Sequence, residues 1–166
     1  KNINLTYNPG YEKLNVKIDH VKLERIIYNL LSNSLKYTPD GGSVQITANF
    51  DKDNQAIIIG VKDTGIGMDP KNQPLVFEKF YREPVKKESD SPQGLGLGLF
   101  IVKKFVDLLG GTISVKSEPG HGTIFTVKLL VQLAEEEIIP DENIQAVTAN
   151  EKSTILVVED NRQLLD

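Results

Sequence analysis

Two asparagines, a lysine and a tyrosine recur at helical spacing between residues 29 and 37 of this 166-residue chain. At about 100° per residue, Asn29, Asn33, Lys36 and Tyr37 form a polar row along one side of a helix. The apolar stripe beside this row consists of Leu23, Ile27, Leu30 and Leu31. A solvated face is the plain alternative, but asparagine is a poor helix former, so two of them favour a binding role. Asparagine oxygens can ligate magnesium, and lysine can neutralise phosphate.

Glycines and one aspartate form a second set of candidates. Seven of the 13 glycines fall into three groups: Gly65 and Gly67; Gly94, Gly96 and Gly98; and Gly120 and Gly122. Glycine lets the backbone approach a ligand closely, so three such loops in a small domain suggest a ligand with a flat base and phosphates. Asp63 lies where an apolar strand pattern ends. Its carboxylate could cap the following turn or accept a hydrogen bond from a ligand amine.

Several other classes of protein are excluded or disfavoured. The GxxxxGKS/T pattern of P-loop nucleotidases does not occur. Residues 94–98 do not fit GxGxxG, and no strand leads directly into them, which disfavours a dinucleotide fold. The lack of cysteine excludes a disulfide scaffold and a thiolate zinc site and fits a reducing compartment. The longest apolar runs are far too short for a membrane span, and a formal net charge of −4 argues against nucleic-acid binding.

The elements that position these residues follow from hydrophobic periodicity. Alternating or continuous apolar residues predict strands near residues 3–7, 14–18, 44–48, 56–61, 113–115 and 125–129. Helical spacing predicts helices over about 19–37 and 99–109, with a short one near 75–81, and Asp19 lies where the N-cap of the first helix belongs. This order predicts an α/β two-layer sandwich, with a mixed sheet of about five to seven strands and about three helices on one face.

The charge distribution divides the chain. Residues 1–131 carry a net charge of +3, residues 132–152 carry −5, and residues 153–166 carry −2. We therefore expect a domain over 1–131 and an acidic linker over 132–152. Residues 153–166 form the last segment, in which an apolar strand pattern at 153–158 ends in Glu159 and Asp160. Because the chain starts at Lys1 without a signal peptide, we expect it to be a piece of a longer protein.

Five motifs over residues 1–131 resemble, in order, those of the ATP-binding catalytic domain of sensor histidine kinases in the GHKL (HATPase) superfamily. Residues 29–37 resemble the N box, and residues 63–67 resemble the first glycine box. The F box is similar to residues 76–82, the second glycine box to residues 94–99, and the last glycine box to residues 120–123. The resemblance implies a Bergerat-type ATP-binding fold.

The resemblance also implies roles for individual residues. Asp63 would accept a hydrogen bond from the adenine amino group, and Asn33 would ligate Mg²⁺ with Asn29 nearby. Lys36 and Arg82 would contact phosphate, and Tyr37 would lie near the sugar and phosphates. The remaining nucleotide-binding positions would be Gly65, Gly67, Gly94, Gly96, Leu97, Gly98, Leu99 and Thr123. Residues 83–93 would form the ATP lid.

The implied reaction is transfer of the ATP γ-phosphoryl to a histidine, with Asn33 and Lys36 as the catalytic residues. In the family that histidine lies on a separate helical dimerisation domain, and neither His20 nor His121 fits the role. The ATPase branches use a glutamate one turn before the magnesium-binding asparagine, and here that position is Asn29. We therefore expect kinase chemistry rather than hydrolysis, and no autophosphorylation of this chain alone.

Residues 153–161 resemble the first strand of a response-regulator receiver domain, in which Glu159 and Asp160 would belong to an acidic magnesium pocket. The resemblance implies that the parent protein is a hybrid kinase with a receiver downstream of this domain, and that this parent is a membrane-associated homodimer. This segment would then lie on the cytoplasmic side of a bacterial inner membrane. Two alternatives remain open: a serine kinase of the anti-sigma-factor type, and a module that binds nucleotide without catalysis.

Overall fold

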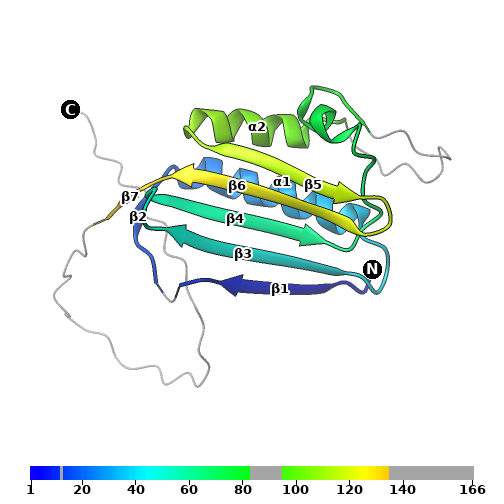
Figure 1. Cartoon of the computed structure of the whole chain (residues 1–166), viewed down its shortest axis with the longest axis horizontal. Coiled ribbons are helices and arrows are strands. Elements are labelled where there is room, and N and C mark those ends of the chain that lie inside the picture. Colours follow the sequence, from blue (N-terminus) through cyan, green and yellow to red (C-terminus); the bar gives the residue numbers. More distant parts are fainter. Residues whose placement is uncertain (12, 83–94, 135–166) are drawn as a thin grey trace, which may run out of the picture.

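The computed structural model describes residues 1–11, 13–82 and 95–134, and its centre is a five-stranded mixed sheet (Figure 1). The strand order is β1 (Asn4–Pro9), β3 (Ser43–Asp51), β4 (Ala56–Asp63), β6 (Gly122–Leu130) and β5 (Thr112–Glu118). β1 pairs with β3 in parallel, and the other neighbours are antiparallel. The predicted mixed sheet is therefore confirmed.

The predicted strand near residues 14–18 does not join this sheet. Only β2 (Val16–Lys17) forms a strand there, and it pairs with β7 (Gln132–Leu133) in a separate two-stranded sheet. The backbone N–H of Ala134 also donates to the Asn15 carbonyl at 3.0 Å. An alternating pattern reports that one face is buried but does not report the partner strand, which explains the error.

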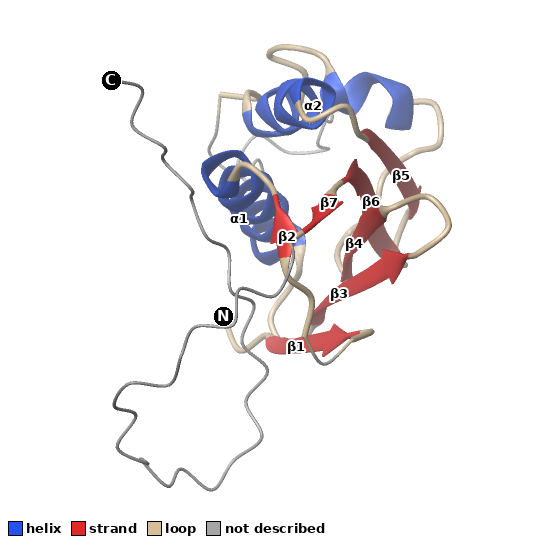
Figure 2. Cartoon of the chain, turned by 90° about the vertical axis from the view of Figure 1, so that its left-hand side faces the viewer, coloured by secondary structure: helices blue, strands red, loops and turns tan. Residues whose placement is uncertain are grey.

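Two α-helices cover one face of the sheet (Figure 2): α1 (His20–Tyr37) and α2 (Gly98–Leu108). The short helix expected near 75–81 is a single 3-10 segment, η1 (Gln73–Phe77). It cannot continue because Glu78 is extended and Phe80 has a left-handed φ of 65°. The described residues therefore contain two α-helices and one 3-10 helix, where about three helices were predicted.

The core lies between the helices and the sheet. From the helices it contains Leu23, Ile26, Leu30, Val102 and Val106, and from the inner strands Val44, Ile57, Ile59, Val61, Phe125, Val127 and Leu129. The predicted apolar stripe of α1 is shifted, because Ile26 is fully buried whereas Ile27 and Leu31 are only half-buried. α1 packs against α2 as well as against the sheet, so its buried face is set by two neighbours rather than by the sheet alone.

The start of α1 is fixed by Asp19, as the sequence predicts. Its Oδ1 accepts a hydrogen bond of 3.0 Å from the Lys22 backbone N–H. We expect Asp19→Ala to lower the free energy of unfolding by about 1 kcal/mol, whereas Asp19→Asn keeps the capping oxygen and stays close to wild type. Urea denaturation of both variants measures the difference. Equal losses in the two variants would contradict a capping role.

The sign change in charge near residue 131 falls close to the end of the described fold. β7 extends to Leu133, so two paired residues lie just beyond that position. Residues 135–152 of the predicted acidic linker (132–152) and the receiver-like segment at 153–166 lie outside the described residues. Within the described part of the chain, no helix is long and apolar enough to cross a membrane.

Candidate functional site

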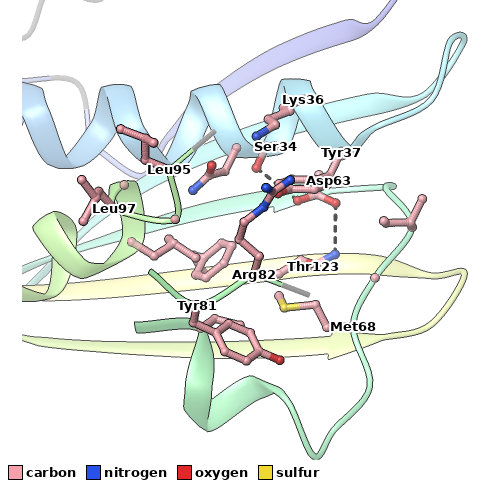
Figure 3. Close-up of a pocket in the computed structure, with 18 residues that line it drawn as sticks. Ser34, Lys36, Tyr37, Asp63, Met68, Tyr81, Arg82, Leu95, Leu97 and Thr123 are labelled. Atoms are coloured by element: carbon pink, nitrogen blue, oxygen red, sulfur yellow. Dashed lines mark hydrogen bonds between the residues drawn. The ribbon is translucent and has the colours of Figure 1, made fainter. Parts of the chain in front are cut away.

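A cavity of about 290 Å³ opens between α1, the N-terminus of α2 and the ends of β4 and β6 (Figure 3). Its lining comes from five segments that are far apart in the chain. They contribute Asn33, Ser34, Lys36 and Tyr37; Asp63, Ile66, Gly67 and Met68; Val76, Tyr81 and Arg82; Leu95, Gly96, Leu97, Gly98 and Leu99; and Thr123 and Phe125. The tertiary structure thus collects three of the four residues of the predicted polar row, the aspartate, and Gly96 and Gly98 of the second glycine group around one space.

Asp63 is the last residue of β4 and forms the floor of the cavity, with only 4% of its surface exposed. Its Oδ1 accepts hydrogen bonds from the backbone N–H groups of Gly65 at 2.9 Å and Thr123 at 3.2 Å. Its Oδ2 accepts one from the Ser34 hydroxyl at 3.1 Å. Burial raises the pKa of Asp63, and these three hydrogen bonds oppose the rise. A buried carboxylate with one donor on Oδ2 can still accept from a ligand.

The first glycine group, Gly65 and Gly67, allows close packing of the loop that follows Asp63. Gly67 has a φ of 66°, and a Cβ there would lie 1.9 Å from the Glu118 carbonyl oxygen. A Cβ at Gly65 would lie 2.7 Å from the Asp63 Oδ1. Gly65 does not line the cavity, so its place is in supporting the aspartate. Both positions need glycine because backbone and carboxylate approach too closely for any side chain.

The second glycine group joins the cavity to α2. Gly96 has a φ of 67°, and a Cβ there would lie 2.6 Å from the Tyr81 carbonyl oxygen. Gly98 begins α2, and its Cβ would lie 3.1 Å from the Asn29 Oδ1. The first residue of this group, Gly94, lies outside the described residues, as do residues 83–93.

The N-terminus of α2 is suited to an anion. Its N-cap residue, Leu97, makes no side-chain hydrogen bond to the first turn, in contrast to Asp19 of α1. Leu97, Gly98 and Leu99 all line the cavity. The N–H groups of a first helical turn lack intrahelical partners, and together with the helix dipole they favour negative charge.

Two cations line the same cavity. Lys36 comes from the last turn of α1, and Arg82 comes from the segment after η1 and reaches towards α1 in Figure 3. Burial lowers the pKa of Lys36, and the charge of Arg82 lowers it further. The Lys36 Nζ also lies 5.2 Å from the ring centroid of Tyr37. Repulsion between two like charges is relieved by a bound anion, so this pair of cations fits phosphates.

The two asparagines of α1 have different surroundings. Asn33 lines the cavity, whereas Asn29 does not. The Asn29 Nδ2 donates to the Arg25 carbonyl at 2.8 Å, which leaves its Oδ1 near Gly98. Within the described residues no group of three His, Cys, Asp or Glu side chains could hold a metal ion. A cation here would need an amide oxygen plus ligand phosphates and water, and Asn33 fits that pattern, which Mg²⁺ commonly adopts.

Seven lining residues were missed by the sequence prediction of the site. They are Ser34, Ile66, Met68, Val76, Tyr81, Leu95 and Phe125. Apart from Ser34, they form the largely apolar walls; Ile66, Val76, Tyr81 and Leu95 lie inside the motif ranges, whereas the patterns at Met68 and Phe125 are those of ordinary loop or core residues. Ser34 did carry a signal, because it is a hydroxyl on the buried side of an amphipathic helix and is only 2% exposed.

Comparison with known proteins assigns the chain to a family. Residues 18–133 match the family model described as histidine kinase-, DNA gyrase B- and HSP90-like ATPase. "Histidine kinase P4" of Formosa agariphila is 34% identical over 99% of this chain and 14% of its own length. The sensor histidine kinase TmoS of Ectopseudomonas mendocina is 43% identical over 72% of this chain. The chain thus spans only 14% and 12% of the length of these two relatives.

Solved structures agree with this assignment. Full-length ShkA in complex with AMPPNP superposes with a TM-score of 0.68 and 29% identity, over 80% of this chain and 26% of ShkA. The mycobacterial sensor histidine kinase MprB gives a TM-score of 0.65 and 28% identity, over 80% of this chain and 84% of that one. The chain therefore belongs to the histidine kinase-, DNA gyrase B- and HSP90-like ATPases, as an ATP-binding catalytic domain of the sensor histidine kinase type.

Proposed function

We propose that this domain binds ATP with Mg²⁺ in the cavity and donates the γ-phosphoryl group to a histidine on a separate helical dimerisation domain. One observation carries the proposal: a single cavity is lined by groups of opposite charge, namely the buried carboxylate of Asp63 and the cations Lys36 and Arg82, together with the uncapped start of α2. That polarity matches a nucleotide, which has an amine on its base and negative charge on its phosphates.

The base end would select adenine. The carboxylate of Asp63 would accept a hydrogen bond from the 6-amino group, and the apolar walls around Met68 and Phe125 would enclose the ring. Guanine presents a carbonyl oxygen at this position. A carboxylate facing a carbonyl leaves two acceptors without a proton between them, which disfavours binding strongly.

The phosphate end would bind the triphosphate. Lys36, Arg82 and the first amides of α2, with the glycines at 96 and 98, would contact the phosphate oxygens. Gly94 and Leu99 would belong to the same set of phosphate-binding residues, and Tyr37 would pack near the sugar. Asn33 would ligate Mg²⁺, with Asn29 nearby. When bound, Mg²⁺ neutralises charge on the phosphates during transfer.

The residues of this chain would act by positioning and by charge neutralisation. Lys36 would hold the terminal phosphate in line with the incoming imidazole, which is itself a nucleophile and needs no general base. The histidines of this chain lie elsewhere. His20 begins α1, and His121 is an exposed turn residue whose Nδ1 lies 3.2 Å from the Pro119 carbonyl. Neither histidine lines the cavity.

The relatives carry the proposal to the parent protein. TmoS and the Staphylococcus aureus SrrB protein are named as sensors, and SrrB is 38% identical over 76% of this chain. We propose that the parent is a homodimeric hybrid kinase of a bacterial inner membrane, with this domain on the cytoplasmic side and a receiver starting near residue 153. Its proposed partners are the receiver and the helical hairpin of the dimerisation domain, which carries the phosphate-accepting histidine. No nucleic acid is expected to bind this segment.

Phosphotransfer to an added acceptor tests this function. Incubated alone with ATP labelled on its γ-phosphate, the chain is expected to stay unlabelled, because it lacks an acceptor histidine. Addition of the helical hairpin that carries this histidine is expected to give acid-labile label on the hairpin. Label retained on His20 or His121, or rapid phosphate release without the hairpin, would overturn the kinase assignment.

The same assay separates the alternatives. Acid-stable phosphoserine on a partner protein would indicate a serine kinase of the anti-sigma-factor type. Saturable ATP binding without transfer to any acceptor would indicate a nucleotide-binding module. The F box at residues 76–82, which resembles that of histidine kinases, favours the histidine kinase over both alternatives.

A further inference from the structure

The Ser117 hydroxyl of β5 lies beside the cavity floor and has three hydrogen-bond partners. Its Oγ accepts from the Met68 backbone N–H, and it lies 2.9 Å from both the Gly122 carbonyl and the Thr123 Oγ1. A hydroxyl has a single proton, and a carbonyl can only accept. The Ser117 proton therefore goes to Gly122, which requires Thr123 to be the donor in the contact between the two hydroxyls.

This assignment determines what Thr123 can offer a ligand. Its hydroxyl proton is engaged by Ser117, so only lone pairs remain for the cavity that Thr123 lines. On the other side of the floor, the Ser34 hydroxyl donates to the Asp63 Oδ2. Ser34 is 2% exposed and Thr123 is 8% exposed, so water has little access to replace either contact. The floor thus presents hydrogen-bond acceptors only.

We propose that Ser34 and Ser117 are positioning residues that keep the floor free of hydrogen-bond donors, and that they set the preference for a 6-amino purine over a 6-oxo purine. This inference rests on the proposed function, because it concerns the base of the nucleotide in the same cavity. Neither serine need touch the nucleotide: Ser34 acts through Asp63, and Ser117 acts through Thr123.

Removing either hydroxyl would create a donor by a different route. In Ser117→Ala, the Thr123 hydroxyl loses its acceptor and can rotate to donate to a 6-oxo group. In Ser34→Ala, one hydrogen bond that stabilises the carboxylate is lost, so the pKa of Asp63 rises and its protonated form can donate. Among the described residues, the other charged side chains lining the cavity are Lys36 of α1 and Arg82; β4, β6 and α2 add none.

The test compares ATP with inosine triphosphate, whose base carries a 6-oxo group. Dissociation constants are measured by calorimetry on the whole chain at pH 8 and pH 6. Both nucleotides carry the same triphosphate, so the ratio of the two constants cancels phosphate titration. Wild type is expected to prefer ATP strongly at both pH values. Ser117→Ala and Ser34→Ala are each expected to narrow that preference by about tenfold, and Ser34→Ala narrows it more at pH 6 than at pH 8.

Three variants control the experiment. Ser114→Ala removes an exposed hydroxyl from β5, and Ser32→Ala removes one from α1, so both should leave the ratio unchanged. Ser117→Thr retains the hydroxyl and should keep the ratio of the two dissociation constants at its wild-type value. If Ser34→Ala and Ser117→Ala weaken both nucleotides equally, or change neither, the serines have no part in base selection and the inference is wrong. If wild type binds neither nucleotide, the proposed function fails as well.

Discussion

Replacing Asp63 with asparagine is expected to weaken ATP binding by about 1–3 kcal/mol, which is a loss of roughly fivefold to more than a hundredfold. The amide oxygen can still accept from the backbone N–H groups of Gly65 and Thr123. The amide nitrogen then replaces Oδ2, where it can donate to the Ser34 oxygen and meets the adenine amino group as a second donor. The expected loss of ATP affinity therefore comes from the changed hydrogen-bond polarity and charge of this side chain, because its shape stays nearly the same.

Calorimetric titration of ATP into Asp63→Asn and wild type at pH 7.5 measures this effect. Asp53→Asn is a matched control, because Asp53 is an exposed residue of the turn between β3 and β4. Urea denaturation without nucleotide separates affinity from folding. Burial already disfavours the charged form of Asp63, so the neutral amide should leave the fold intact. An unchanged ATP affinity in a folded Asp63→Asn variant would remove Asp63 from the binding site.

Replacing Gly67 with alanine is expected to have the largest effect on the fold around the site. A left-handed φ costs an alanine about 1–2 kcal/mol. At Gly67 the new Cβ would also overlap the Glu118 carbonyl oxygen, which lies 1.9 Å away. The backbone must move to relieve that contact, which adds about 1–3 kcal/mol, the usual cost of overpacking. Because Ile66 and Met68 both line the cavity, the displacement also reaches the nucleotide site.

Gly120 offers a matched control for this prediction. It has a φ of 78°, similar to the 66° of Gly67, and nothing lies within 4 Å of the position that its Cβ would take. Gly120→Ala therefore measures the backbone cost alone. Urea denaturation should show a clearly larger loss for Gly67→Ala, and ATP affinity should fall only in that variant. Equal losses would show that the close approach to β5 is unimportant.

The sequence predicted the elements that have strong local signals. The N-cap at Asp19, the helix that ends near Tyr37 and the central strand that ends at Asp63 are all confirmed. It failed where the outcome depends on a partner. The pattern at residues 14–18 could not show that β2 pairs with β7, and the stripe of α1 could not show that Ile26 is fully buried whereas Ile27 is only half-buried.

The sequence by itself determined which residue types are available for a nucleotide: an aspartate at a strand end, amides and a lysine on one helix, and clustered glycines. Motif spacing is a local property of the chain, so it can be recognised without knowledge of the fold. Only the tertiary structure decided that Asn33 lines the cavity whereas Asn29 packs against α2, and that Ser34 and Ser117 orient the floor. Those contacts join residues 29 positions apart and strands paired side by side. Hydrogen-bond direction depends on distances between such segments, which periodicity does not encode.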